Sequence, residues 1–202
     1  MILDDQGFVP LVSLAGRQDL VRMYLKTAIA HGMLPAPERW AGRNDPGFEP
    51  LLQPGMHRLA WSDVRRRAVD AFPRSATRAA LWARLVRFVD QVAGLDVVDQ
   101  VWLAGSFLST KPDSGDVDLV AVLRMEQALA MSPAETVQLE EALDDAKTWH
   151  LDVAVAFESD LVTLAYLQGL LGFREDRTRA RGIAVLPIIR NVSTSCGAVA
   201  PK

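Results

Sequence analysis

Four short apolar runs in the second half of the chain restrict what it can fold into. Each is rich in β-branched residues and ends in a turn or a polar loop, which is typical of strands: VVDQVWLAG (97–105), DVDLVAVL (116–123), HLDVAVAF (150–157) and GIAVLPII (182–189). Helical patterns separate these runs along the chain. Strands and helices mixed in this way predict an α+β fold, in which helices flank a mixed sheet on at least one face.

Polar residues mark where the helices between the strands begin. Ser62 is placed to cap a short helix over 61–72, and Ser75 or Thr77 to cap a longer one that ends at Gly94. The apolar side of that longer helix is predicted to hold Ala80, Leu81, Leu85, Val86 and Val89. Ser132-Pro133-Ala134-Glu135 has the spacing of a capping box and predicts a helix to about residue 147. A further helix is predicted near 160–172.

The first 58 residues differ from the rest. A predicted helix at about 17–31 is followed by a stretch, 32–55, whose five prolines and four glycines disfavour long regular elements. We therefore divide the chain into a helix and Pro/Gly-rich arm (1–58), a folded domain (59–192) and a C-terminal tail (193–202).

Composition narrows the classes of protein that fit. Half of the 202 residues are hydrophobic, which is enough for a real core, and the net charge of -3 gives no general attraction to nucleic acid. The single cysteine, Cys196, allows no intramolecular disulfide and no Cys-based metal site. No apolar run approaches the roughly 18 to 20 residues of a membrane span, and acidic residues stand where a secretory signal has basic ones. These features predict a soluble, cytoplasmic protein.

Two aspartates lie two positions apart in the second apolar run. Because successive side chains of a strand point to opposite faces, Asp116 and Asp118 are expected to project from the same face. Two carboxylates at that distance repel each other unless a cation lies between them, and hard cations such as Mg²⁺ or Mn²⁺ take carboxylate oxygens. The pair therefore predicts a metal site.

A Gly-Ser pair ends the run before the aspartates. Gly105 lets a phosphate approach the backbone, and the Ser106 hydroxyl can donate to its oxygens. Asp152, in an otherwise apolar strand, is the candidate for a third carboxylate, because an unpaired charge is costly to bury there. Lys111, in the loop between the serine and the aspartates, is a candidate to contact a phosphate, with simple solvation as its other interpretation.

These residues resemble the motif of the polymerase-beta-type nucleotidyltransferase superfamily: Ala104-Gly105-Ser106, nine residues, Asp116-Val117-Asp118-Leu119, and Asp152 on a later strand. The resemblance implies a mixed sheet flanked by helices and transfer of a nucleoside monophosphate from an NTP such as ATP to a hydroxyl group. It also implies that Gly105 and Ser106 hold the triphosphate and that Asp116 and Asp118 bind the metal. Asp152 would bind a second metal and help to deprotonate the acceptor.

A wider resemblance extends from LQPGMHRLAWSDV through GSF and GDVDLV to FREDRTRARGIAVLPI. It is to a little-characterised family of small bacterial and phage nucleotidyltransferase-like proteins. That resemblance implies RNA, with tRNA as the natural example, or a protein as the acceptor, and a role in a toxin–antitoxin system with a cognate protein partner. The loop FLSTKPDSG departs from many small superfamily members because it lacks their Arg-Gly pair.

Other interpretations stay open. A catalytically silent module that keeps the fold and engages a protein partner is the alternative function. The basic run Arg174, Arg177, Arg179 and Arg181 is a candidate for binding triphosphate or an RNA backbone, or else a solvated loop. His150, if it lies in the strand with Asp152, shares the Asp152 face.

Overall fold

A five-stranded mixed sheet forms the centre of the protein. The computed structural model describes residues 47–172 and 180–188. Its strands are β1 (Gly55–Arg58), β2 (Val98–Ala104), β3 (Val117–Leu123), β4 (Leu151–Phe157) and β5 (Gly182–Pro187), in the spatial order β1-β5-β2-β3-β4. β1 and β5 run parallel, as do β3 and β4, whereas β2 is antiparallel to both of its neighbours. The predicted α+β fold is confirmed.

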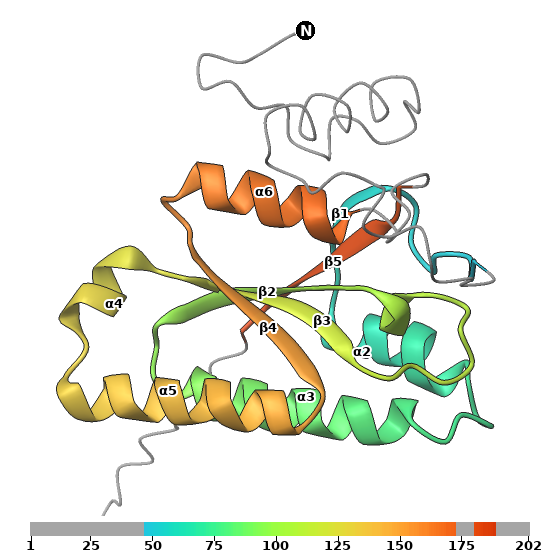
Figure 1. The fold of residues 1–202 in the computed structure, drawn as a ribbon, viewed down its shortest axis with the longest axis horizontal. Coiled ribbons are helices and arrows are strands. Elements are labelled where there is room, and N and C mark those ends of the chain that lie inside the picture. The colour runs from blue at the N-terminus through green and yellow to red at the C-terminus, as the bar shows by residue number, and fades with distance from the viewer. Residues whose placement is uncertain (1–46, 173–179, 189–202) are drawn as a thin grey trace, which may run out of the picture.

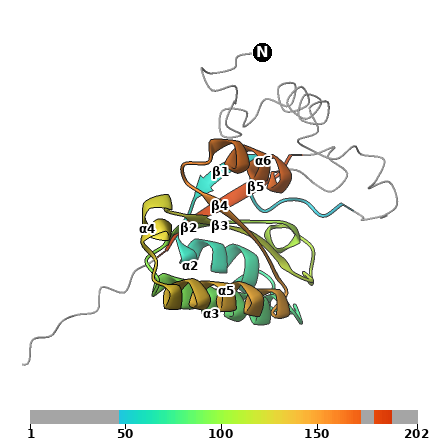
Figure 2. The ribbon, with the colours of Figure 1, turned by 60° about the vertical axis from the view of Figure 1, so that its left-hand side comes forward.

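Helices cover both faces of this sheet (Figure 1). They are α2 (Trp61–Arg65), α3 (Arg78–Ala93), α4 (Met125–Ala130), α5 (Pro133–Thr148) and α6 (Leu161–Leu171). A π-helix (Arg66–Asp70) continues α2, and a 3-10 helix (Ser106–Leu108) follows β2. α3 and α5 lie side by side against one face, and α6 crosses the other face (Figure 2).

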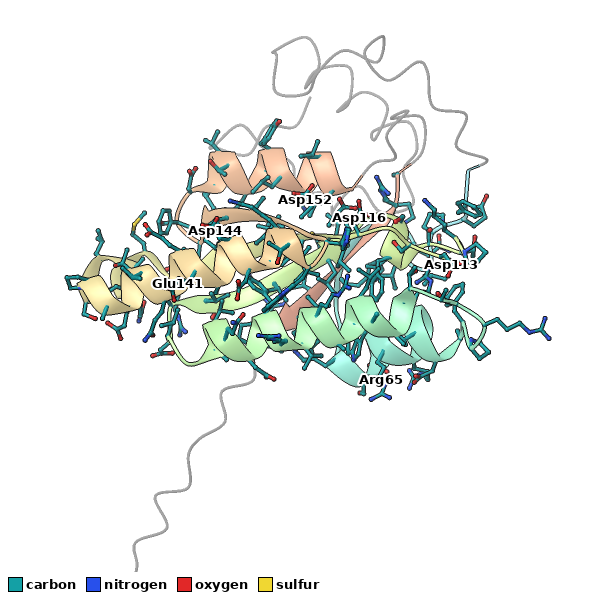
Figure 3. The ribbon with its side chains drawn as sticks, turned by 60° about the horizontal axis from the view of Figure 1, so that its bottom comes forward. Arg65, Asp113, Asp116, Glu141, Asp144 and Asp152 are labelled. Carbon is teal, nitrogen blue, oxygen red and sulfur yellow. The ribbon has the colours of Figure 1, made fainter. Side chains whose placement is uncertain are left out.

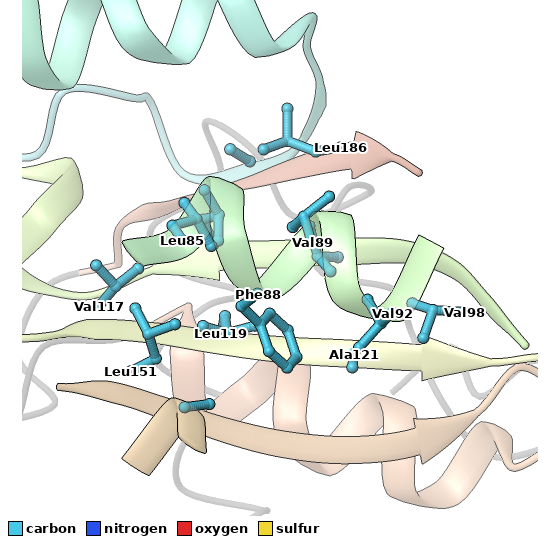
Figure 4. Close-up of a cluster of buried hydrophobic side chains, with 14 of the residues drawn as sticks. Leu85, Phe88, Val89, Val92, Val98, Val117, Leu119, Ala121, Leu151 and Leu186 are labelled. Atoms are coloured by element: carbon cyan, nitrogen blue, oxygen red, sulfur yellow. The ribbon is translucent and has the colours of Figure 1, made fainter. Parts of the chain in front are cut away.

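The main core lies between the sheet and α3 (Figure 4). Alternation along β3 sends Val117, Leu119 and Ala121 toward α3, where they meet Leu85 and Phe88. Val120 and Val122, on the opposite face of β3, belong to a second cluster with Leu167 of α6. Both faces of β3 are therefore buried, which accounts for its nearly continuous apolar sequence.

The helix starts agree with the sequence in part. The capping box of α5 is confirmed, because Ser132 accepts from the Glu135 amide while the Glu135 carboxylate accepts from the Ser132 amide. The predicted Ser62 cap is wrong: the Ala60 carbonyl already accepts from the Val64 amide at 3.2 Å, so the N-cap is Ala60, two residues before Ser62, and α2 begins at Trp61. Thr77 is the N-cap of α3, although its side chain makes no capping bond.

The apolar side of α3 needs one correction. Leu81, Leu85 and Val89 are buried as predicted, but Ala80 is exposed. The buried face follows Leu81 at helical spacing, and Ala80 is turned about 100° away from it.

The sequence did not predict β1. Residues 55–58, which the composition assigned to an irregular arm, pair in register with β5 from Gly55↔Gly182 to Arg58↔Val185. A strand of four residues among prolines has no local signal, and it forms here through a partner from the far end of the chain. The predicted helix at 17–31 and the tail at 193–202 lie outside the described residues. No helix within 47–172 and 180–188 is long and apolar enough to cross a membrane.

Candidate active site

The sheet brings two of the predicted carboxylates together. Asp118 on β3 is in register with Asp152 on β4, and on its other side with Ala104 on β2. Residues in register on neighbouring strands point to the same face, and the strands lie about 4.8 Å apart. Both aspartates lie on the α6 face, and each is the second residue of its strand, β3 or β4, which run parallel. Asp152 is exposed, whereas Asp118 is half-buried.

Gly105 lies directly against Asp118. Its φ of 74° and ψ of -159° place it in a backbone region that is essentially restricted to glycine. A Cβ atom on Gly105 would lie 1.5 Å from Oδ2 and 2.6 Å from Cγ of Asp118. Glycine is therefore required here both by the backbone turn and by the close approach of the carboxylate.

Ser106, which follows Gly105, contacts the third predicted carboxylate, Asp116. Its Oγ hydrogen-bonds with the Ser114 Oγ and lies 3.5 Å from Oδ1 of Asp116. The Ser114 hydroxyl in turn donates to the Asp116 carbonyl at 2.9 Å. Asp116 lies one residue before β3, is exposed, and is fixed by this loop rather than by strand pairing.

The predicted residues thus meet at one end of the sheet, where Figure 3 labels Asp116 and Asp152. All three carboxylates offer oxygen donors, which suits a hard divalent cation, and the register of Asp118 with Asp152 supplies two of them side by side. Asp116 is turned to Ser106. Within the described ranges, no three His, Cys, Asp or Glu side chains already surround one point suited to a metal ion. The three carboxylates thus offer the ligand type that Mg²⁺ prefers, without forming a metal-binding cluster among the described residues.

Other predicted residues are placed differently. Lys111 is half-buried, and its backbone carbonyl accepts from Arg78 at 2.6 Å. His150 has a φ of 59° and precedes β4, so strand alternation does not apply to it and its expected place on the Asp152 face is not supported by the strand. Arg174, Arg177 and Arg179 lie outside the described residues; the Arg181 amide donates to the Gly172 carbonyl at 2.8 Å.

Arg78 is the residue that the sequence analysis missed. It opens α3, is 0% exposed, and donates to backbone carbonyls of the loop between β2 and β3. A signal was present: Arg78 lies three and seven positions before Leu81 and Leu85, on the face that α3 buries. An arginine in line with the buried face of a helix indicates a buried polar partner.

Asp113 ties the far end of this loop to the start of α3. Its Oδ1 accepts from the Ser75 Oγ at 2.8 Å and from the Ala76 amide at 2.7 Å. The bond from Ser75, followed by that from Ala76, lowers the pKa of the Asp113 carboxyl below its usual value. Because the pKa of the folded state is lower than the unfolded-state pKa of about 3.9, the charged carboxyl stabilises the fold at pH values above about 3.9. This stabilisation is lost as the pH falls through the folded-state pKa.

We expect Asp113→Asn, which resembles the protonated acid, to be less stable than the wild type at neutral pH, because a charged acceptor makes the stronger hydrogen bonds. The difference should shrink as the pH falls below about 4 and the wild-type carboxyl takes up its proton. Urea unfolding from pH 7 to about pH 2 measures it. Asp90→Asn, at an exposed position of α3, is the control, and a difference that is independent of pH would contradict the prediction.

Comparison with known proteins gives one family. A model of a family of unknown function, DUF6932, matches residues 46–187, which is more than half of the chain. The chain belongs to this family. The DUF6932 match takes in β1 through β5 and every residue of the candidate site. No curated protein and no solved structure matches the chain.

Proposed function

We propose that the protein is a metal-dependent nucleotidyltransferase, which moves a nucleoside monophosphate from an NTP to a hydroxyl acceptor. One observation carries the proposal: residues up to 47 positions apart in the sequence converge at one end of the sheet. Gly105 packs on Asp118, and Asp118 is in register with Asp152. Three neighbouring strands thus supply a glycine turn and two carboxylates at one place.

The resemblance to the polymerase-beta-type superfamily supports the proposal independently of the geometry. It concerns the same residues, Gly105, Ser106, Asp116, Asp118 and Asp152, and none of them was chosen from the structure. A purely structural role explains them less well, because two carboxylates in register on neighbouring strands repel each other and cost stability.

Each side chain has a role in the proposed reaction. The Ser106 hydroxyl, half-buried beside the glycine turn, would donate to an oxygen of the triphosphate. Asp116, Asp118 and Asp152 would hold Mg²⁺ or Mn²⁺, which when bound neutralises phosphate charge and aligns an in-line displacement. Asp152 belongs to β4, the last strand of the sheet, and its exposed carboxylate would accept the proton of the attacking hydroxyl.

The acceptor in this proposal is a hydroxyl of RNA, such as a tRNA, or of a protein. A large acceptor fits, because Asp152 is exposed and β4 is an edge strand of the sheet, where a macromolecule can approach. The toxin–antitoxin role and the cognate partner that the resemblance implies stay predictions.

Transfer of label tests the proposal. Each of four α-labelled NTPs, with Mg²⁺, is incubated with the full chain and a cell lysate, and label is counted in the RNA and protein fractions. We expect label from one or two NTPs in one fraction with the wild type, and none with Asp152→Asn. In parallel, NTP and Mg²⁺ together should raise the melting temperature, because ligand binding stabilises the native state.

Equal labelling by the wild type and Asp152→Asn would contradict the proposed role of Asp152. Absence of both label and thermal stabilisation would overturn the proposal and favour a silent module that binds a protein partner. Thermal stabilisation without label would retain the nucleotide site and direct the search to a small-molecule acceptor.

A further inference from the structure

Arg78 is the largest side chain among the fully buried ones. A charged group in a core is costly unless it is fully hydrogen-bonded. No salt bridge recorded for the described residues involves Arg78; its donors instead meet main-chain carbonyls. At Nη1 these are Phe107 at 2.6 Å and Ala68 at 2.7 Å, at Nη2 Lys111 at 2.6 Å, Ser109 at 2.7 Å and Ser106 at 3.4 Å, and at Nε Pro112 at 3.1 Å and Lys111 at 3.2 Å.

Five of these carbonyls belong to one loop, residues 106–112, which joins the glycine turn to the Asp116 segment. Apart from the 3-10 turn at Ser106–Leu108, this loop belongs to no helix or strand, so most of its carbonyls need partners from elsewhere. The Arg78 guanidinium has five N–H donors in a fixed planar arrangement, so a single side chain can hydrogen-bond several of these carbonyls at once.

The remaining carbonyl is supplied by the π-helix. In a regular α-helix the Ala68 carbonyl would accept from the amide of Phe72, but the Phe72 amide donates to Val69 at 2.9 Å. The Ala71 amide reaches back to Arg66 at 3.1 Å, which is the longer bond of a π-helix. The Ala68 carbonyl is thereby directed to Arg78, and the irregular turn has a structural explanation.

Two aromatic rings and one carboxylate complete the surroundings. The guanidinium carbon lies 3.9 Å from the centre of the Phe72 ring and 5.4 Å from that of Phe107. Burial lowers the pKa of Arg78 to about 10, against the charge of Asp113, so the group stays charged at neutral pH. Its hydrogen bonds are therefore charge-assisted, and the flat guanidinium fits between rings where an ammonium does not.

The held loop carries the parts of the candidate site that strand pairing does not place. The Ser106 carbonyl accepts from Arg78, and also from the Ser109 hydroxyl at 2.7 Å. The same residue's hydroxyl faces Asp116. Asp118 and Asp152 are fixed by their register, whereas Ser106 and Asp116 depend on the loop.

We propose that Arg78 is the positioning residue of the site. It holds the 106–112 loop in the conformation that sets Ser106 beside Asp116 for binding a triphosphate. The part of this inference that concerns nucleotide rests on the proposed function. The part that concerns the loop does not.

Arg78→Lys and Arg78→Met test the proposal in the full-length chain. Lysine keeps the charge but has a single nitrogen, which cannot span carbonyls on both sides of the guanidinium, and methionine keeps length without any donor. The matched control is Arg84→Lys: Arg84 lies on the same helix, is half-buried, and its Nη1 donates to one carbonyl, that of Trp149, at 3.4 Å.

The first readout is hydrogen exchange without nucleotide. In Arg78→Lys we expect amides of 106–114 to exchange at least about tenfold faster, the factor for one lost hydrogen bond of about 1.4 kcal/mol, while β2, β3 and β4 keep their protection. Arg84→Lys should exchange as the wild type does. Unchanged protection of 106–114 in a folded Arg78→Lys variant would overturn the proposal. If Arg78→Met does not fold, Arg78→Lys alone decides.

The second readout separates positioning from general destabilisation. With the NTP that the transfer assay selects, Arg78→Lys should raise the KM for nucleotide about tenfold or more and lower the rate at saturating nucleotide by less than about threefold. A variant with a faster-exchanging loop but an unchanged KM would show that the loop is structural only, and would overturn the positioning role. If the wild type binds no NTP, the proposed function fails, and hydrogen exchange still decides whether Arg78 holds the loop.

Discussion

Asp118→Asn is expected to abolish nucleotidyl transfer and to leave the fold intact. Asparagine has the shape of aspartate but no charge, so it fits beside Gly105 without displacing it. The loss should be on the order of a thousandfold or more, because a carboxylate that holds metal against the transferring phosphoryl group acts directly on the transition state. Transfer of label from the selected NTP measures the effect, and hydrogen exchange of β3 confirms the fold.

Asp99→Asn is the matched control for this prediction. Asp99 lies on β2 of the same sheet, is exposed, and is far along the strand from Gly105. It should transfer at the wild-type rate. Retention of activity in Asp118→Asn would remove the main support for catalysis, since Asp118 lies against Gly105 and is in register with Asp152.

Gly105→Ala is expected to be strongly destabilising for a change of a single methyl group. The positive φ costs about 1–3 kcal/mol for a residue with a Cβ atom, and overpacking against a close neighbour costs about 1–3 kcal/mol more. The added atom would lie 1.5 Å from Oδ2 of Asp118, so the carboxylate must also turn away. Urea unfolding should show a loss of about 2–6 kcal/mol, and transfer activity should fall with it.

Gly115→Ala is the control, because a Cβ atom there meets nothing within 4 Å. It should change stability by less than about 1 kcal/mol. A double variant sharpens the test: Asp118→Ala removes Oδ2 and Cγ, the two closest atoms, and leaves only Cβ at 3.1 Å, so Gly105→Ala should then cost much less and the two changes should not be additive. Additive losses would mean that the contact between Gly105 and Asp118 carries no energy.

Much of the fold follows from local patterns. The strands β2 to β5 and the helices α3, α5 and α6 agree with the sequence to within a few residues, because each has a strong period or a cap such as that of Ser132. β1 and α4 were not predicted. Both are short, and β1 depends on a partner more than a hundred residues away.

The sequence predicts which residues belong to the candidate site, but not how they are held in place. Spacing indicated Gly105, Ser106, Asp116 and Asp118, and an isolated charge in an apolar run indicated Asp152. The sequence did not indicate that the position of Asp116 is determined by a loop, whereas that of Asp118 is determined by strand pairing. That distinction depends on where β3 begins, which is a matter of pairing with β2 and β4.

The sequence by itself determined the class of fold, most of its elements and the residues that are chemically able to form a site. Hydrophobic period, capping and turn chemistry act over a few residues, so they can be recognised in a single chain. Only the tertiary structure decided that β3 lies between β2 and β4, which brings Asp118 against Gly105 and into register with Asp152. It also decided that Arg78 is buried under the 106–112 loop. Contacts between distant segments depend on the summed burial and pairing of the whole domain, and no local pattern specifies them.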